Sequence, residues 1–144
     1  MCSVYDVAAY ILEKCGMMTH LRLQKLVYYA QAWSLVWDEK PLFPDEVEAW
    51  ANGPVVRRLY DRLRKTFGVD RRILGRGNPE KLSATARETV DAVIKFYGKR
   101  SSQYLSDLTH MEDPWRNTRE GLAPGERGNR VITHASMAEY YSSL

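Results

Sequence analysis

The Gly53-Pro54 dipeptide is the feature that most constrains the fold of this chain. Glycine allows backbone geometries that side chains forbid, and proline has no amide hydrogen to lose and a φ angle suited to the first turn of a helix. We therefore expect a sharp turn at Gly53-Pro54 and a helix over 54–66 directly after it. The surrounding residues 48–56 (EAWANGPVV) contain no nucleophile, metal-binding motif or phosphate-binding loop. They predict a shaped surface and not an active site.

The length and composition favour one globular domain over residues 1–144. The chain is 44% apolar and 27% charged, close to the average for soluble globular proteins. No apolar run approaches membrane-spanning length, and the N-terminus lacks a basic region followed by an apolar block. We therefore expect a cytoplasmic protein without a membrane partner. Cys2 and Cys15 match no zinc spacing, and we interpret them as small core residues.

Residues 20–37 form the predicted centre of the fold. One helical face carries apolar residues at the required spacing, and further apolar side chains cover much of the remaining surface. A helix that is apolar nearly all round is usually surrounded by other elements. Lys25 lies on this crowded helix and needs either an acidic partner or a route for its amine to water. The fold class is therefore mainly α, a compact bundle of five to six helices around 20–37.

The remaining elements are predicted from capping residues and apolar spacing. Besides 54–66, these signals predict helices over 3–14, 83–98, 101–113 and from 133 to the end. At most one short β-hairpin is expected near 41–50, formed by 41–43 and 46–50. Glycine, proline and polar residues predict loops at 69–81 and 116–130, the second of them exposed and mobile.

Catalytic interpretations of the polar residues have little support. His110 could be a base oriented by Glu112 or Asp113, or a helix-end residue that binds terminal carbonyls; we favour the second because no nucleophile or metal pattern accompanies it. Glu46 and Glu48 could form an acid–base pair, but two solvated surface acids have the same spacing. The four tryptophans are expected in the core. We therefore predict no enzyme activity, no metal and no cofactor.

Positive charge is concentrated in one part of the chain. Residues 54–82 contain nine Lys/Arg and three Asp/Glu, whereas the remainder has 12 and 15. Arg58, Arg62 and Lys65 would form one stripe on the helix after Pro54. Such a stretch, over 54–76, could bind nucleic acid, bind an acidic protein, or be plain solvated surface. We favour protein over nucleic acid because no recognition-helix motif is present. The expected partner-binding residues are Asn52, Gly53, Pro54, Arg57, Arg58 and Arg62.

Three segments together resemble a known family. Residues 23–31 (LQKLVYYAQ), 48–56 (EAWANGPVV, followed by Leu59-Tyr60) and 105–115 (LSDLTHMEDPW) resemble, in this order, the motifs of the Panacea domain. This is the SocA-like or GepA-like, phage-associated antitoxin family. The resemblance extends from about residue 4 to 142. The chain departs from it at Asn52, where members often have an aromatic residue, and at Arg57, where they often have proline.

The resemblance implies a small helical antitoxin that binds and neutralises a cognate protein toxin of a bacterial or prophage toxin–antitoxin pair. One branch of the family acts instead as a proteolytic adaptor that delivers its toxin to a protease, and this remains an alternative. A nucleic-acid-binding regulator is the alternative from another class. The motif residues expected to hold the shape are Lys25, Leu26, Tyr28, Tyr29, Trp50, Val55, Tyr60, His110 and Trp115.

Overall fold

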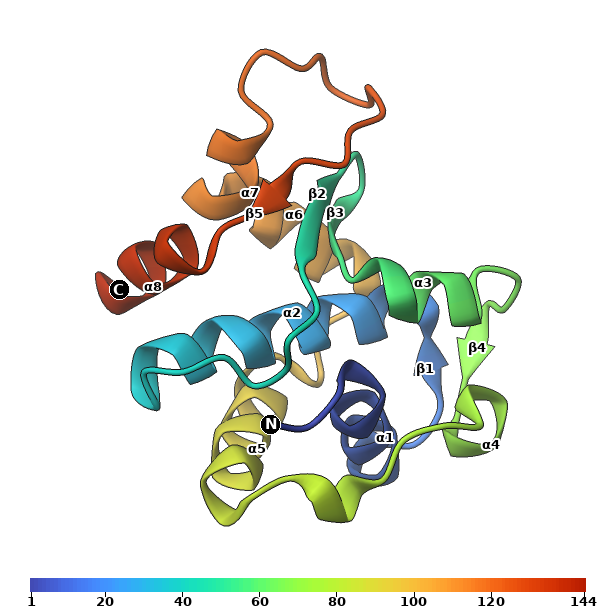
Figure 1. The fold of residues 1–144 in the computed structure, drawn as a ribbon. Helices are drawn as coiled ribbons and strands as arrows, with labels where there is room; N and C mark the ends of the chain where they lie inside the picture. Colours follow the sequence, from blue (N-terminus) through green and yellow to red (C-terminus); the bar gives the residue numbers. More distant parts are fainter.

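The chain folds around one central helix, α2 (Figure 1). The structure is a computed structural model that describes all residues, 1–144. The α-helices are α1 (Val4–Cys15), α2 (His20–Trp37), α3 (Arg57–Leu63), α4 (Arg71–Leu74), α5 (Ala84–Tyr97), α6 (Ser102–Met111), α7 (Asp113–Thr118) and α8 (His134–Ser142), with a 3-10 turn, η1 (Pro79–Lys81). The mainly α prediction is confirmed, but the helix number exceeds the expected five to six. The additional helices, α4 and α7, are too short to show an apolar period.

The centre of the fold is as predicted. Thr19 caps α2 by accepting a hydrogen bond from the Arg22 backbone N–H. In Figure 1, α1 and α5 lie below α2, whereas the β-hairpin and α6 lie above or behind it. Twelve of the 18 residues of α2 are buried, which explains its apolar surface. The tryptophan prediction was only partly right, because Trp37 at the end of α2 is 51% exposed.

The β-structure differs from the prediction. Strand β2 (Val47–Trp50) pairs antiparallel with β3 (Gly53–Val55) on one side and with β5 (Val131–Ile132) on the other. The predicted hairpin with 41–43 was wrong: the side-chain amide of Gln31 on α2 accepts hydrogen bonds from the backbone N–H groups of Leu42 and Phe43. A second two-stranded sheet joins β1 (Met18–Thr19) to β4 (Gly68–Val69).

The helix after Pro54 begins later than predicted, at Arg57. Gly53, with φ +125°, turns the chain straight back along β2, so the residues after it extend the sheet before any helix forms. Pro54 fits there because β3 is an edge strand and needs no donor on its outer side. The helix ends at Leu63, so Lys65 is not part of the predicted stripe.

The two predicted loops contain more regular structure than expected. Residues 69–81 include α4 and η1, and 116–130 begins in α7 and continues to β5. Arg119 is buried and connects the segment 116–130 to the hairpin, because its side chain donates a hydrogen bond of 2.9 Å to the carbonyl oxygen of Ala49. Arg130 donates to the carbonyl of Glu120 at 2.7 Å. The mobility of 116–130 remains a prediction. None of the helices has the length and apolar character required to span a membrane.

Candidate functional site at the hairpin turn

The turn between β2 and β3 is the point where the three sequence motifs meet. Gly53 lies against Lys25 of α2 and Thr109 of α6. A Cβ atom at Gly53 would lie 2.5 Å from Lys25 Cε and 3.3 Å from Thr109 Oγ1. Real Cβ atoms do not approach other carbon atoms so closely, and φ is +125°. Only glycine therefore allows the hairpin to pack this closely on α2.

The third motif fixes the turn from the opposite side. Trp115 Nε1 donates to the carbonyl oxygen of Trp50 at 2.8 Å, and Ser106 Oγ donates to that of Asn52 at 2.9 Å. The His110 ring stacks on Trp115 with centroids 4.0 Å apart. These contacts hold the backbone of the turn in one conformation.

The environment of His110 does not suit a catalytic base. Its Nε2 atom is buried and has no hydrogen-bond partner. Burial lowers its pKa, an effect that the neighbouring Asn52 backbone partly offsets. Of the two acids considered as orienting groups, Glu112 accepts hydrogen bonds from Tyr29 and Tyr141, and Asp113 pairs with Arg116. The stacked ring is better explained as part of the support for the turn.

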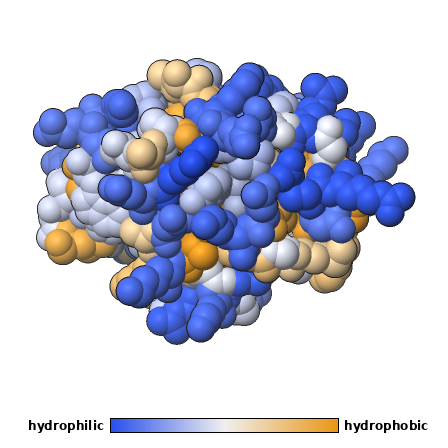
Figure 2. Space-filling model, turned by 90° about the horizontal axis from the view of Figure 1, so that it is seen from below, coloured by the Kyte–Doolittle hydropathy of each residue, from blue (hydrophilic) through white to orange (hydrophobic).

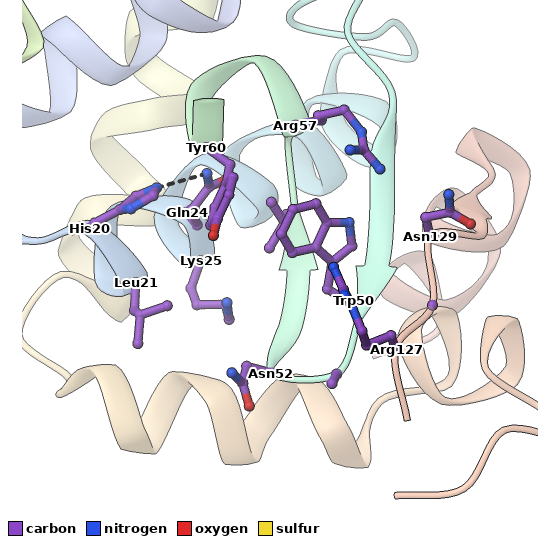
Figure 3. Close-up of a pocket in the computed structure, with 13 residues that line it drawn as sticks. His20, Leu21, Gln24, Lys25, Trp50, Asn52, Arg57, Tyr60, Arg127 and Asn129 are labelled. Atoms are coloured by element: carbon purple, nitrogen blue, oxygen red, sulfur yellow. Dashed lines mark hydrogen bonds between the residues drawn. The ribbon is translucent and has the colours of Figure 1, made fainter. Parts of the chain in front are cut away.

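A pocket of about 550 Å³ opens beside the turn (Figure 3). It lies between the start of α2, the hairpin, α3 and the segment 127–129. Basic, amide and aromatic side chains line it, and no Asp or Glu does so. The lining residues are His20, Leu21, Gln24, Lys25, Trp50, Ala51, Asn52, Val55, Arg57, Tyr60, Arg127, Gly128 and Asn129.

Lys25 provides the buried charge of the pocket. The residue is 1% exposed, and its amine donates one long hydrogen bond, 3.4 Å, to the carbonyl oxygen of Pro54. The amine points into the pocket in Figure 3. Burial lowers its pKa to about 8. Of the two alternatives expected from the sequence, the acidic partner is absent, and the amine faces the pocket.

Gln24 and His20 form the neutral side of the pocket. Gln24 Oε1 accepts from the Val56 backbone N–H at 3.0 Å, which fixes the orientation of the amide. Its nitrogen then donates to the Val56 carbonyl oxygen and to His20 Nε2, 3.1 Å away. His20 must accept this bond, so its proton is on Nδ1. Burial, aided by the charge of Lys25, lowers the His20 pKa to about 4, which makes the ring neutral at pH 7.

Arg57 lies at the mouth of the pocket but is already paired. It contacts Glu48 with a shortest N–O distance of 2.8 Å and lies over the Trp50 ring. Trp50 Nε1 also donates to Glu48. Burial opposes ionisation of Glu48, yet the hydrogen bonds from Arg57 and Trp50 lower its pKa overall. Glu48 is therefore engaged in a structural network with Arg57 and Trp50.

The other predicted contact residues are distributed over two sides. Asn52 is exposed at the turn, at the opposite end of β3 from Arg57, whereas Gly53 and Pro54 are buried and shape the turn. Arg58 packs over the Tyr5 ring of α1, and Arg62 donates to the carbonyl oxygen of Leu74 in α4.

Seven lining residues were not among the site or motif residues named from the sequence: His20, Leu21, Gln24, Ala51, Arg127, Gly128 and Asn129. The last three come from a segment whose composition indicated only a loop.

An exposed apolar rim, formed by Met17, Leu21 and Phe67, lies next to the pocket. Leu21 lines the pocket and is 52% exposed, and Phe67 is 84% exposed. The backbone N–H of His20 binds the Phe67 carbonyl, and Met17 lies against Gly68. By contrast, the lower face in Figure 1, seen in Figure 2, is mainly hydrophilic with small scattered apolar groups.

The comparisons with known proteins agree with this convergence of motifs. The family described as antitoxin SocA-like, Panacea domain, matches residues 23–116. The chain belongs to this antitoxin family. The match begins in α2 and ends just after Trp115, so it contains all three motif segments of the Panacea domain and leaves α1, β5 and α8 outside. No curated protein and no solved structure matches the chain.

The buried amine predicts an unusual pH dependence for this Panacea domain. The pKa of Lys25 is about 8 in the folded chain and 10.5 without burial. Between these values the unfolded state binds more protons, so this group makes the folded state more stable as pH rises. We expect wild-type stability to gain about 2–3 kcal/mol relative to Lys25→Met between pH 7 and pH 10. Urea denaturation of both proteins at the two pH values measures this difference.

The comparison with Lys25→Met removes the contributions of cysteines and tyrosines that titrate in the same range. Methionine has a similar length and no charge, and Lys25→Met should be the more stable protein at pH 7. Lys99→Met is the matched control because Lys99 is exposed. Its stability should follow that of wild type at both pH values. Parallel pH profiles for wild type and Lys25→Met would contradict the burial of a charged amine.

Proposed function

We propose that this protein neutralises a cognate protein toxin by binding it directly. The family match over residues 23–116 is the observation on which the proposal depends. The proposed contact face combines the hairpin turn at Asn52, the pocket with Arg57 at its mouth, and the apolar rim. Exposed apolar side chains beside a basic pocket are typical of protein interaction sites.

The proposed mechanism is occlusion by a preformed surface. The turn is held by hydrogen bonds from Ser106 and Trp115 and by the close packing of Gly53 on Lys25. A face that is ordered before binding loses little conformational entropy when the toxin docks. The domain needs no chemical step for this role, because covering the toxin's active or targeting surface is sufficient.

The alternatives have less support from the side-chain contacts. Of the eight cations in 54–76, Arg57, Arg58 and Arg71 pair with acids and Arg62 binds a backbone carbonyl. A nucleic-acid site would therefore depend on the remaining exposed side chains, Arg64, Lys65, Arg72 and Arg76. For a proteolytic adaptor, no particular contact surface for a protease stands out. Toxin half-life in cells that express both proteins would distinguish adaptor from occlusion, since only an adaptor shortens it.

The test uses the reading frame beside this gene as the candidate toxin. Co-expression of the wild-type protein should restore growth, and the purified pair should form a complex. We expect Arg57→Glu to weaken the complex at least tenfold, because it reverses the charge at the mouth of the pocket. Arg58→Glu with Arg62→Glu tests the α1–α4 side separately, and Lys99→Glu is the control on an exposed site elsewhere.

Two results of these experiments would contradict the proposal, each in a different part. If wild type neither rescues growth nor binds the candidate toxin, the antitoxin function for that pair is wrong. If Arg57→Glu remains folded and neutralises as well as Lys99→Glu, the contact face lies elsewhere on the domain.

A further inference from the structure

The pocket beside the hairpin turn has the character of an anion site. We propose that it binds one carboxylate group, supplied by an acidic side chain of the toxin that inserts between α2 and the hairpin. The inference rests on the proposed antitoxin function and specifies what the contact face recognises.

An unpaired positive charge, the amine of Lys25, lies at the base of the pocket. Burial of an ammonium group is unfavourable unless a partner compensates it. Lys25 is 1% exposed and its amine has one backbone hydrogen bond, at 3.4 Å. Its pKa of about 8 leaves it mostly protonated at pH 7. A carboxylate that entered the pocket would supply the missing partner in an environment of low dielectric, where the attraction is strong.

Hydrogen-bond donors without a partner in the chain also line the pocket. The side chains of Asn52, Tyr60 and Arg127 line the pocket and make no hydrogen bond within the chain. They approach from the hairpin turn, α3 and the segment after α7, so they surround the Lys25 amine from different directions (Figure 3). No acidic residue lines the pocket and competes for them. The arrangement provides several donors for one anionic group.

The charge of the pocket favours a carboxylate over a phosphate group. Of the two other strong cations that line the pocket, Arg57 is already paired with Glu48 and Arg127 is exposed to solvent, and His20 is uncharged at pH 7. This leaves one fully buried positive charge, which matches a carboxylate better than a phosphate dianion. The apolar rim of Met17, Leu21 and Phe67 beside the pocket would contact the rest of an inserted protein segment. A volume of about 550 Å³ also suits a small free carboxylic acid, so the test must separate the two sources.

The experiment compares toxin affinity for wild type, Lys25→Met and the control Lys99→Met. We expect Lys25→Met to lose tenfold to a hundredfold in affinity and Lys99→Met to lose none. Alanine substitution of each Asp and Glu of the toxin should then identify one residue whose loss weakens binding to wild type but not to Lys25→Met. Such coupling is the signature of a direct charge pair.

A second variant tests the site without removing the lysine. Asn52→Glu places a carboxylate at the mouth of the pocket and breaks no side-chain hydrogen bond. It should compete with the toxin's acid and lower affinity at least tenfold, whereas Asn52→Gln should bind like wild type. Unchanged affinity in both Lys25→Met and Asn52→Glu, with both proteins folded, would overturn the inference.

Titration with acetate and with inorganic phosphate, followed by the NMR signal of the Lys25 amine, separates the ligand sources. Weak acetate binding that the toxin displaces supports the proposal. Saturable acetate binding with toxin affinity independent of Lys25 would assign the site to a free carboxylate, and a preference for phosphate would reject the carboxylate. If wild type binds toxin and only the Lys25 effect is missing, this inference alone fails; if wild type binds no toxin, the proposed function fails with it.

Discussion

Gly53→Ala is expected to destabilise the domain by about 2–6 kcal/mol, because two independent penalties add. A residue with a side chain at φ +125° holds a strained backbone, which costs about 1–3 kcal/mol. The new Cβ would also lie 2.5 Å from Lys25 Cε, so either the buried lysine side chain must move or the hairpin and α2 must separate. Overpacking of this kind costs about 1–3 kcal/mol more.

Gly121→Ala separates the two penalties. Gly121 also has a positive φ, +88°, but nothing lies within 4 Å of its Cβ position. We therefore expect only the strain at Gly121, about 1–2 kcal/mol. Chemical denaturation of the two variants beside wild type gives the comparison. Equal losses would mean that the contact of Gly53 with Lys25 is relaxed at little cost and does not require glycine at the turn.

Gly53→Ala should also affect toxin binding, because the strain would be relieved at the hairpin turn. Movement of the hairpin away from α2 would widen the pocket and displace Asn52 from Ser106. Toxin affinity should therefore fall in folded Gly53→Ala but not in Gly121→Ala. The glycine is thus expected to act on binding through the position of the turn, since its own atoms are buried.

The parts of the fold that were predictable are those encoded by neighbouring residues. The helices α1, α2, α5, α6 and α8 have apolar spacing and a Ser or Thr cap whose oxygen accepts a backbone hydrogen bond. Short elements such as α4 and α7 lack such a pattern. The strand pairing was missed because a distant side chain, Gln31, binds the backbone of Leu42 and Phe43. No local signal reports that contact.

The sequence indicated the centre of the pocket and not its extent. The Gly53-Pro54 turn lies beside the pocket, and the charge of Lys25 on an apolar helix indicated that its amine needed a partner or an opening. Arg127 could not be found, because it reaches the pocket from a segment of no distinctive pattern. The basic helix face was predicted as one stripe, but α3 is short and its arginines bind three different neighbours.

The second large effect is expected about one turn further along α2, where a carboxylate is buried among tyrosines. Glu112 is 5% exposed, and its Oε1 accepts hydrogen bonds of 2.7 Å from the hydroxyl groups of Tyr29 and Tyr141. Tyr28 is 3.0 Å from the Tyr141 hydroxyl. This network joins α2 and α8 to the junction of α6 and α7. It explains why a Tyr-Tyr pair on α2 and the segment before Trp115 belong to the same motif set.

Replacement of both donors, Tyr29→Phe with Tyr141→Phe, should cost about 3–5 kcal/mol at pH 8, because each lost hydroxyl leaves part of a buried charge unsatisfied. The loss should be smaller at pH 5. Burial already raises the Glu112 pKa, and the tyrosine hydrogen bonds lower it, so their removal raises it further. When the folded pKa exceeds the unfolded value, stability is present at low pH and is lost as pH rises through the folded pKa. Denaturation curves at the two pH values measure this sign directly.

Tyr140→Phe is the matched control in the same helix, since the Tyr140 hydroxyl makes no hydrogen bond within the chain and the side chain is only partly buried. It should change stability by less than about 1 kcal/mol at either pH. Adding Glu112→Gln to the double variant removes the charge and should abolish the pH dependence, although a buried amide still lacks partners. A double variant that is equally destabilised at pH 5 and pH 8 would show that packing of the rings, and not the buried carboxylate, determines the stability of this junction.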